Sequence, residues 1–341
     1  MIVDTATLAT LRAAMLPMDG TIADHAEEIL AAAAEAMSPA RARELAYVDL
    51  TAGSCLLPLA FAAAGARSVV VNDIATRSIV AARALFAGGD VPAGMLDDAL
   101  AGRLPARAHV PSFRFASDYL PEAACRTFDR LYHLDLPAPQ AATLRYLALR
   151  HVLRLADPEE GFRVLLTHDR AQLLADREED WSRFVARLAE GTDGIAAALL
   201  AVRTGARAAA AAGSTRVLQA DMRDIAAAID FTGPCLVAVN PPTNGVDEYV
   251  IDDQIVHSLV ANRLVPLSRC TEDPAEFWTR RVEAALAPMP TGTLFLVWGG
   301  DGAMTAAACE AAWRRHGDVV HRATISFGDG RGATWGIFRR R

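Results

Sequence analysis

The sequence predicts an α/β protein built on a mostly parallel β-sheet. Short apolar strands alternate with helical segments between residues 46 and 88, and the alternation resumes after residue 213. This spacing is typical of parallel sheets covered by crossover helices. Near the C-terminus, two strand-like segments at 319–327 and 333–340 flank a glycine-rich turn, which predicts a closing hairpin.

The first half contains two strand–helix units. Its expected elements are strands at 46–50 and 68–71, a turn at 51–54, and helices over 55–64 and 75–86. Gly65 follows the first helix, and Gly88 and Gly89 follow the second, as expected of residues that end helices. Residues 1–45 have helical spacing and high alanine content, so we expect helices before the first strand.

The second half repeats the alternation after a long interruption. Its expected elements are strands at 217–221, 235–240 and 293–298, with helices over 225–229, within 247–288, and over 304–316. The interruption, residues 89–212, contains seven prolines and helical stretches such as 140–155 and 180–188. We therefore predict N-terminal helices (1–45), a main domain formed by 46–88 and 213–341, and a helical insertion (89–212).

Composition excludes several kinds of chemistry. The 341 residues contain 34 arginines and no lysine, so neither a Schiff-base lysine nor a Walker lysine exists. The five cysteines and eight histidines show no spacing typical of metal ligands, and we expect no metal site. The formal net charge is −7, no apolar run is long enough to span a bilayer, and the N-terminus lacks a signal-peptide pattern. We expect a cytoplasmic protein.

The first candidate site is the turn Asp49-Leu50-Thr51-Ala52-Gly53-Ser54, between a strand and a helix. Ligands of open parallel sheets bind at the carboxyl ends of the strands, where a helix N-terminus offers free amide donors. A single glycine disfavours the dinucleotide pattern GxGxxG. A plain strand–helix turn would also explain this segment taken alone.

Asp73 strengthens the interpretation of that turn. It ends the second strand, 20 residues after Gly53, where a carboxylate typically binds ribose hydroxyls. By itself the pair Asn72-Asp73 could be a turn or a helix cap. Together with the glycine turn it predicts a nucleoside-binding site.

A third motif, Asn240-Pro241-Pro242-Thr243, follows an apolar strand. Consecutive prolines stiffen the loop and donate no amide hydrogen bonds, which leaves the Asn side chain and the nearby carbonyls as acceptors. Such acceptors suit an exocyclic amino group, whose two hydrogens they can bind. A structural stop would explain the prolines but not the preceding Asn.

These motifs, in this order, resemble those of class I S-adenosylmethionine-dependent amino-methyltransferases, above all the DNA adenine-N6 methyltransferase family. The resemblance covers roughly 46–88 and 213–341. It implies a Rossmann-like fold with a seven-stranded, mostly parallel sheet and a C-terminal β-hairpin, and S-adenosyl-L-methionine as cofactor. It further implies contacts to that cofactor from the two strand-end motifs and the third strand, namely Asp49, Thr51, Gly53, Asp73, Ile74, Asp221 and Met222.

For catalysis, the resemblance implies that Asn240, Pro241 and Pro242 hold the target amine. The family's motif ends in an aromatic residue that stacks on the flipped base, whereas this chain has Thr243, and Tyr249 is the nearest aromatic substitute. Cys55 stands where the family usually has a second glycine, and the family's lysine-containing N-terminal motif is missing.

The acceptor is open at this point. Arginines and aromatic residues alternate through the insertion and could clamp a nucleic acid, but the same arginines also suit a solvated helix face. DNA is one candidate partner. The alternatives are a small-molecule, nucleotide or protein amine, or a methyltransferase-like module without catalysis. Neither a membrane partner nor an oligomeric state is indicated.

Overall fold

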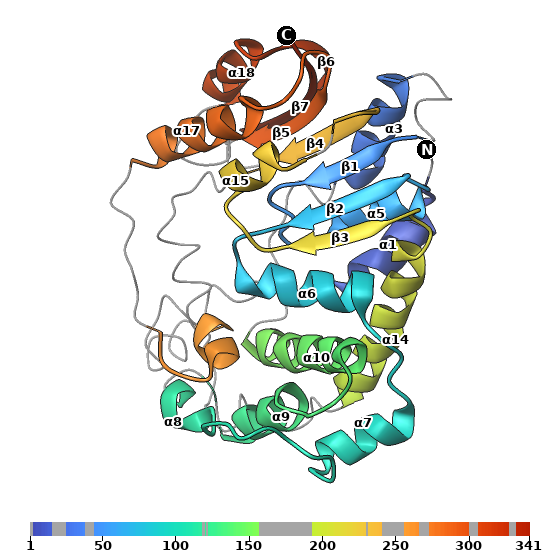
Figure 1. Ribbon diagram of the computed structural model, residues 1–341, viewed down its shortest axis with the longest axis vertical. Helices are drawn as coiled ribbons and strands as arrows, with labels where there is room; N and C mark the ends of the chain where they lie inside the picture. The colour runs from blue at the N-terminus through green and yellow to red at the C-terminus, as the bar shows by residue number, and fades with distance from the viewer. Residues whose placement is uncertain are drawn as a thin grey trace.

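The computed structural model describes most of the chain, namely residues 3–15, 25–37, 44–117, 120, 122–156, 193–229, 231–240, 256–265, 273–299, 306–326 and 332–341. These residues contain a seven-stranded sheet in the order β3-β2-β1-β4-β5-β7-β6 (Figure 1). The strands are β1 Ala46–Asp49, β2 Ser68–Asn72, β3 Thr215–Leu218, β4 Cys235–Val239, β5 Leu294–Gly299, β6 Gly317–Ser326 and β7 Gly332–Arg340.

Strand directions identify the fold. β1 pairs in parallel with β2 and β4, and the parallel pairing extends to β3 on one side and β5 on the other. β7 is antiparallel to both of its neighbours, β5 and β6. The protein therefore has a Rossmann-like class I methyltransferase fold, with the predicted C-terminal hairpin, and the expectation of fold class is confirmed.

Helices cover both faces of the sheet. In chain order they are α1 Thr5–Ala14, α3 Ala26–Glu35, α5 Leu56–Ala63, α6 Thr76–Ala87, α7 Ala93–Leu100, α8 Phe113–Ala116, α9 Glu122–Tyr132, α10 Ala138–Ala156, α14 Asp193–Ala209, α15 Met222–Ala227, α17 Pro274–Leu286 and α18 Ala306–Arg314. None of the helices that the structure describes is both long and apolar enough to cross a membrane.

The central strands are buried along their whole length, as expected of strands covered on both faces. Successive side chains alternate between two cores because side chains of a strand point to opposite faces. In β1, Tyr47 belongs to the larger core, which includes α1, α3, α5, α6, α10 and α14, whereas Val48 belongs to the smaller core. The smaller core contains residues of α15, α17 and α18.

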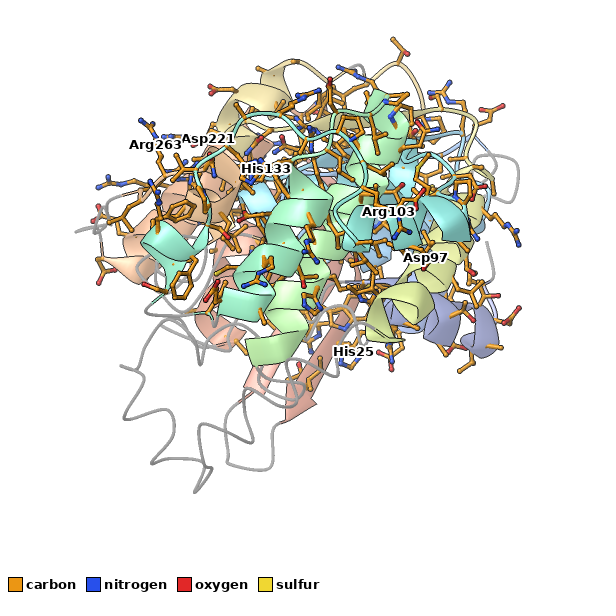
Figure 2. All side chains as sticks on the ribbon, turned by 90° about the horizontal axis from the view of Figure 1, so that it is seen from below. His25, Asp97, Arg103, His133, Asp221 and Arg263 are labelled. Atoms are coloured by element: carbon orange, nitrogen blue, oxygen red, sulfur yellow. The ribbon has the colours of Figure 1, made fainter. Side chains whose placement is uncertain are left out.

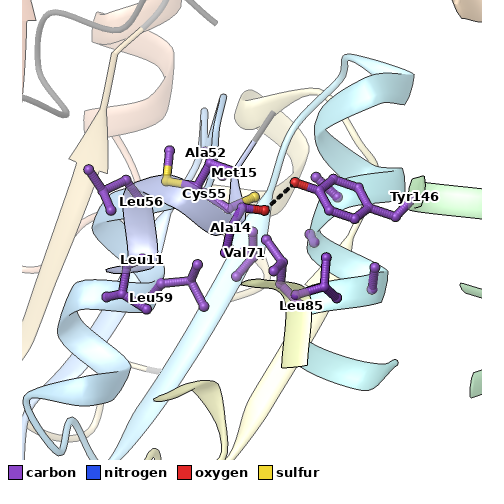
Figure 3. Packing of buried hydrophobic residues seen from close by; sticks show 14 of the residues in the cluster. Leu11, Ala14, Met15, Ala52, Cys55, Leu56, Leu59, Val71, Leu85 and Tyr146 are labelled. Carbon is purple, nitrogen blue, oxygen red and sulfur yellow. Dashed lines mark hydrogen bonds between the residues drawn. The ribbon is translucent and has the colours of Figure 1, made fainter. Parts of the chain in front are cut away.

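The described helices of 89–212 share the larger core. α10 and α14 both pack against α6, and α14 also packs against α1. The hydroxyl of Tyr146, on α10, donates to the carbonyl of Ala14 at the end of α1, beside Met15 and Leu85 (Figure 3). Arg150 donates to the neighbouring carbonyl of Ala13. α1, α6, α10 and α14 thus pack in one layer. The division into N-terminal helices, main domain and insertion stays a prediction.

The boundaries around the third strand differ most from their prediction. The third strand covers 215–218 rather than 217–221, and the next helix begins at Met222 instead of residue 225. The reason is that Asp221 is the N-cap of α15, where its carboxylate accepts from the backbone N–H of Arg223. The helix predicted over 180–188 lies outside the described residues.

Candidate functional site

The residues predicted to bind a ligand gather at one edge of the sheet. β1, β2, β3 and β4 are parallel, so their carboxyl ends lie along the same side, and the arrowheads in Figure 1 point that way. Asp49 ends β1, Asp73 follows β2, and Asn240 follows β4. In folds of this kind, this edge is where ligands bind.

Gly53 and Asp73 are joined directly. The backbone N–H of Gly53 donates to Oδ2 of Asp73 over 2.8 Å, and Oδ1 of Asp73 accepts from the N–H of Ala75 over 2.8 Å. Gly53 has a φ of +51°, in the left-handed region that favours glycine. A Cβ added there would meet only the Thr51 carbonyl, 4.0 Å away, so space for a close ligand remains beside this backbone.

Asp49 is a buried carboxyl at the same edge. It accepts from the Tyr47 hydroxyl over 2.8 Å and from the backbone N–H of Thr51 over 3.1 Å. Burial raises the pKa of Asp49 to about 7, with a further rise from the nearby Asp73 charge, although both hydrogen bonds lower it. The carboxyl can therefore change its charge near neutral pH, and a cation bound beside it would favour the ionised form.

Thr51 connects the first turn to the end of β4. Its hydroxyl accepts the backbone N–H of Asn240 over 2.8 Å, across 189 positions of sequence. The main chain of Asn240 is therefore fixed against the turn between β1 and α5. Pro241, Pro242, Thr243 and Tyr249, the other residues predicted for catalysis, lie outside the described residues.

Asn72 has a role that the sequence did not reveal. Its buried side-chain amide donates to the carbonyls of Leu50 and Ala220, both over 3.0 Å, and its Oδ1 accepts the N–H of Ala220 over 3.1 Å. One side chain at the end of β2 thus holds the segments that follow β1 and β3. The only available signal was an Asn at a strand end, which a turn explains equally well.

Ile74 follows Asp73 and is 69% exposed, the largest exposed fraction among the large apolar side chains that the structure describes. An exposed apolar side chain next to a carboxylate suits a nucleoside, because the carboxylate can bind the sugar hydroxyls while the apolar group contacts the base. Both residues lie between the end of β2 and the start of α6.

Asp221 and Met222 lie at the start of α15, which follows the neighbouring strand β3. The Asp221 carboxylate accepts from Nε and Nη2 of Arg223, over 2.9 and 2.8 Å, and also from Arg281 on α17. Partial burial would raise the Asp221 pKa, but these hydrogen bonds outweigh it and hold the pKa below its ordinary value. Met222 is buried in the smaller core. Contact of either residue with a cofactor stays a prediction.

Cys55 adopts a left-handed backbone conformation at the start of α5. Its φ is +69°, and it is the N-cap of α5 without a side-chain cap hydrogen bond. Its fully buried thiol packs in the larger core beside Ala52 and Leu56 (Figure 3). Burial raises its pKa well above the ordinary value, and the charges of Asp73 and Asp49 add to this. The thiol therefore stays protonated and acts in packing.

Among the residues that the structure describes, no group of three or more His, Cys, Asp and Glu side chains could hold a metal ion. The groups gathered at this edge instead comprise carboxylates, a glycine turn with space beside it, an exposed apolar side chain and a fixed asparagine.

Comparisons with known proteins add little to this picture. No family model matches the chain, and no curated protein matches it. Among solved structures, it is similar to the rRNA methyltransferase aviRa from Streptomyces viridochromogenes, with a TM-score of 0.37 and 15% sequence identity. That alignment covers 99% of this chain and 94% of the other. A similarity this low carries no argument of its own. The fold assignment therefore rests on the strand order of this chain.

Proposed function

We propose that the protein is an S-adenosylmethionine-dependent N-methyltransferase that holds its acceptor amine at Asn240. The hydrogen bond between Asn240 and Thr51 carries this proposal. It fixes the residue expected to bind the amine against the turn expected to bind the cofactor. Methyl transfer requires this adjacency, because the acceptor nitrogen and the methyl group must approach within contact distance.

The residues present suit the cofactor. Asp73 would bind the ribose hydroxyls, because its carboxylate follows β2 at the ligand edge and is fixed there by hydrogen bonds from Gly53 and Ala75. Ile74 would contact the adenine. Asp49 would lie near the positively charged methionine part, and Gly53 would allow the close approach of that part to the backbone.

The chain itself would supply orientation rather than a strong base. S-adenosylmethionine supplies an electrophilic methyl group on a sulfonium. The Asn240 side chain and the Pro241 carbonyl would accept the two amine hydrogens, which directs the nitrogen lone pair at that methyl group. The nitrogen–carbon bond forms as the carbon–sulfur bond breaks with its electron pair on sulfur, and the extra proton on nitrogen leaves to water. The same acceptors stabilise the positive charge that develops on nitrogen.

The first acceptor to test is the N6 amine of adenine in DNA, because the Asn-Pro-Pro motif resembles that family. Thr243 in place of the stacking aromatic keeps a small-molecule, nucleotide or protein amine as the second candidate. A non-catalytic module is the third.

The experiment measures transfer of labelled methyl groups to a panel of acceptors, comparing wild type with Asn240→Ala. We expect Asn240→Ala to lower the rate by about 100-fold or more, the usual effect of removing one transition-state hydrogen bond. Cofactor affinity, measured in parallel, should change little. If Asn240→Ala leaves every measured transfer rate unchanged, the catalytic role is wrong and the non-catalytic module becomes the better account.

A further inference from the structure

Two segments far apart in the sequence form one surface. The N–H of Val110 donates to Oδ1 of Asn262, and Nδ2 of Asn262 donates back to the Val110 carbonyl, both over 2.6 Å. Asn262 has a φ of +54°, a conformation that Asn tolerates better than most residues. This reciprocal pair fixes the segment before α8 against residues 256–265, which follow the Asn-Pro-Pro-Thr motif in sequence.

Both segments are anchored to the rest of the molecule. Val256 and Leu259 are buried in the larger core, which also contains Leu236 of β4. On the other side, the N–H of Arg107 donates to the carbonyl of His133, whose ring stacks on His109 with 4.3 Å between centroids. The surface is therefore anchored in the same hydrophobic core as β4.

Apolar and cationic side chains are exposed together here. Val110, Phe113 and Leu264 are 44%, 40% and 60% exposed and account for three of the five exposed large apolar side chains among the described residues. Arg114 and Arg263 are exposed next to them in sequence. Arg263 lies at the periphery of the molecule in Figure 2. We call Val110, Phe113, Arg114, Arg263 and Leu264 the basic face.

The two stretches that contain the basic face are locally basic. Residues 99–117 and 254–271 contain five arginines, and the acidic residues Asp98, Asp118, Asp253 and Glu272 directly flank them. Arg103 and Arg107 form ion pairs with Asp98 and Asp135. Within the described part of the chain, neither Arg114 nor Arg263 has an ion-pair partner. Both arginines are exposed.

We propose that the basic face binds an unpaired polynucleotide strand and presents one of its bases to the site at Asn240. Arginine binds phosphates bidentately, and an exposed phenylalanine offers a stacking surface that every base can use. An unpaired base needs no extrusion from a duplex, which agrees with the lack of an aromatic residue at Thr243. The inference deepens the proposed function by naming its acceptor class, and it rests on that function.

The experiment measures binding of a labelled 20-nucleotide strand by fluorescence anisotropy, using single-stranded RNA, single-stranded DNA and duplex DNA as separate arms. We expect one of the single strands to bind more tightly than the duplex. Arg114→Glu and Arg263→Glu should each weaken that binding tenfold or more. Each should also reduce the slope of log affinity against log salt by about 0.7, the value for one phosphate contact to a single strand. Phe113→Ala should weaken binding at least fivefold, and Phe113→Tyr should restore it.

The matched controls change similar groups elsewhere. Arg216→Glu reverses the charge of an exposed arginine on β3, and Leu200→Ala removes an exposed apolar side chain on α14. Both should bind the strand like wild type. Calorimetry with S-adenosylmethionine on every variant separates the two claims, because the basic-face variants should keep full cofactor affinity. If the wild type does not bind S-adenosylmethionine, the proposed function is contradicted instead.

Three results would overturn the proposal for the basic face. The first is equal strand binding by wild type and the charge-reversed variants. The second is cofactor binding without measurable affinity for any polynucleotide, or with affinity for the duplex alone. The third is a dimer, detected by sedimentation, that Phe113→Ala dissociates, because a second copy would then cover this face.

Discussion

The backbone N–H of Asn240 donates to the hydroxyl of Thr51, so the end of β4 and the turn after β1 are held together by one hydrogen bond. Thr51→Val keeps the shape of this side chain but removes the acceptor. We expect methyl transfer to fall about tenfold, the effect of one lost hydrogen bond of roughly 1.4 kcal/mol. The rate should be measured with cofactor at saturation.

Thr51→Ser is the matched control, because it retains the hydroxyl and loses only a methyl group. It should keep most of the wild-type rate. A Thr51→Val protein as active as wild type would show that this bond does not position Asn240 for catalysis.

Asn72→Ala should destabilise the fold by about 2–3 kcal/mol. Its amide pairs with one carbonyl of Leu50 and with both backbone groups of Ala220, and these lose their partner in the variant. Urea denaturation measures the change. Asn262→Gly also breaks two hydrogen bonds, but at a half-buried position near the surface, and glycine accepts the left-handed backbone there, so it should cost less than about 1 kcal/mol. Equal costs for the two variants would contradict the role of Asn72 as a tie between strands.

Asp49 should make stability depend on pH. Burial raises its folded-state pKa to about 7 from an ordinary value of 3.8, so between these values the folded protein retains a proton that the unfolded chain has lost. The contribution is therefore fully present below about pH 4, falls as the pH rises toward 7 by at most about 1.4 kcal/mol per unit, and stays level above that.

The comparison uses Asp49→Asn, which cannot ionise, with urea unfolding at pH 5 and pH 8. The free energy of unfolding of the wild type should fall more between these pH values than that of the variant. Parallel pH profiles would contradict the raised pKa. S-adenosylmethionine affinity should change in the opposite direction and rise toward pH 7 in the wild type alone, because the cationic cofactor favours the ionised carboxyl.

The sheet and the edge that carries the candidate site could be predicted from the sequence because they depend on local patterns. Apolar runs marked each strand, and the strand ends at Asp49, Asp73 and Asn240 followed directly. The ties across the edge could not be predicted. Asn72 contacts Ala220 from 148 positions away, and Thr51 contacts Asn240 from 189 positions away, so no local pattern records them.

Two further features depended on backbone conformation. The end of β3 was predicted too late because Asp221 caps a helix, and a capping Asp after an apolar run resembles the last residue of a strand. Cys55 stands at a position where the resemblance predicts glycine, and its backbone adopts the left-handed conformation that favours glycine.

Calorimetry with S-adenosylmethionine tests the central claim, a cofactor site formed by Gly53 and Asp73, most directly. The wild type should bind with measurable heat, and Asp73→Ala should lower the affinity about tenfold or more, because it removes charge-assisted hydrogen bonds to the ribose. Leu200→Ala, which is far from this edge in sequence and exposed, should bind like wild type. Asp73→Asn removes the charge but keeps the shape of the side chain, and its cofactor affinity should lie between those of the wild type and Asp73→Ala. No heat with the wild type, or normal affinity in a folded Asp73→Ala protein, would contradict the account.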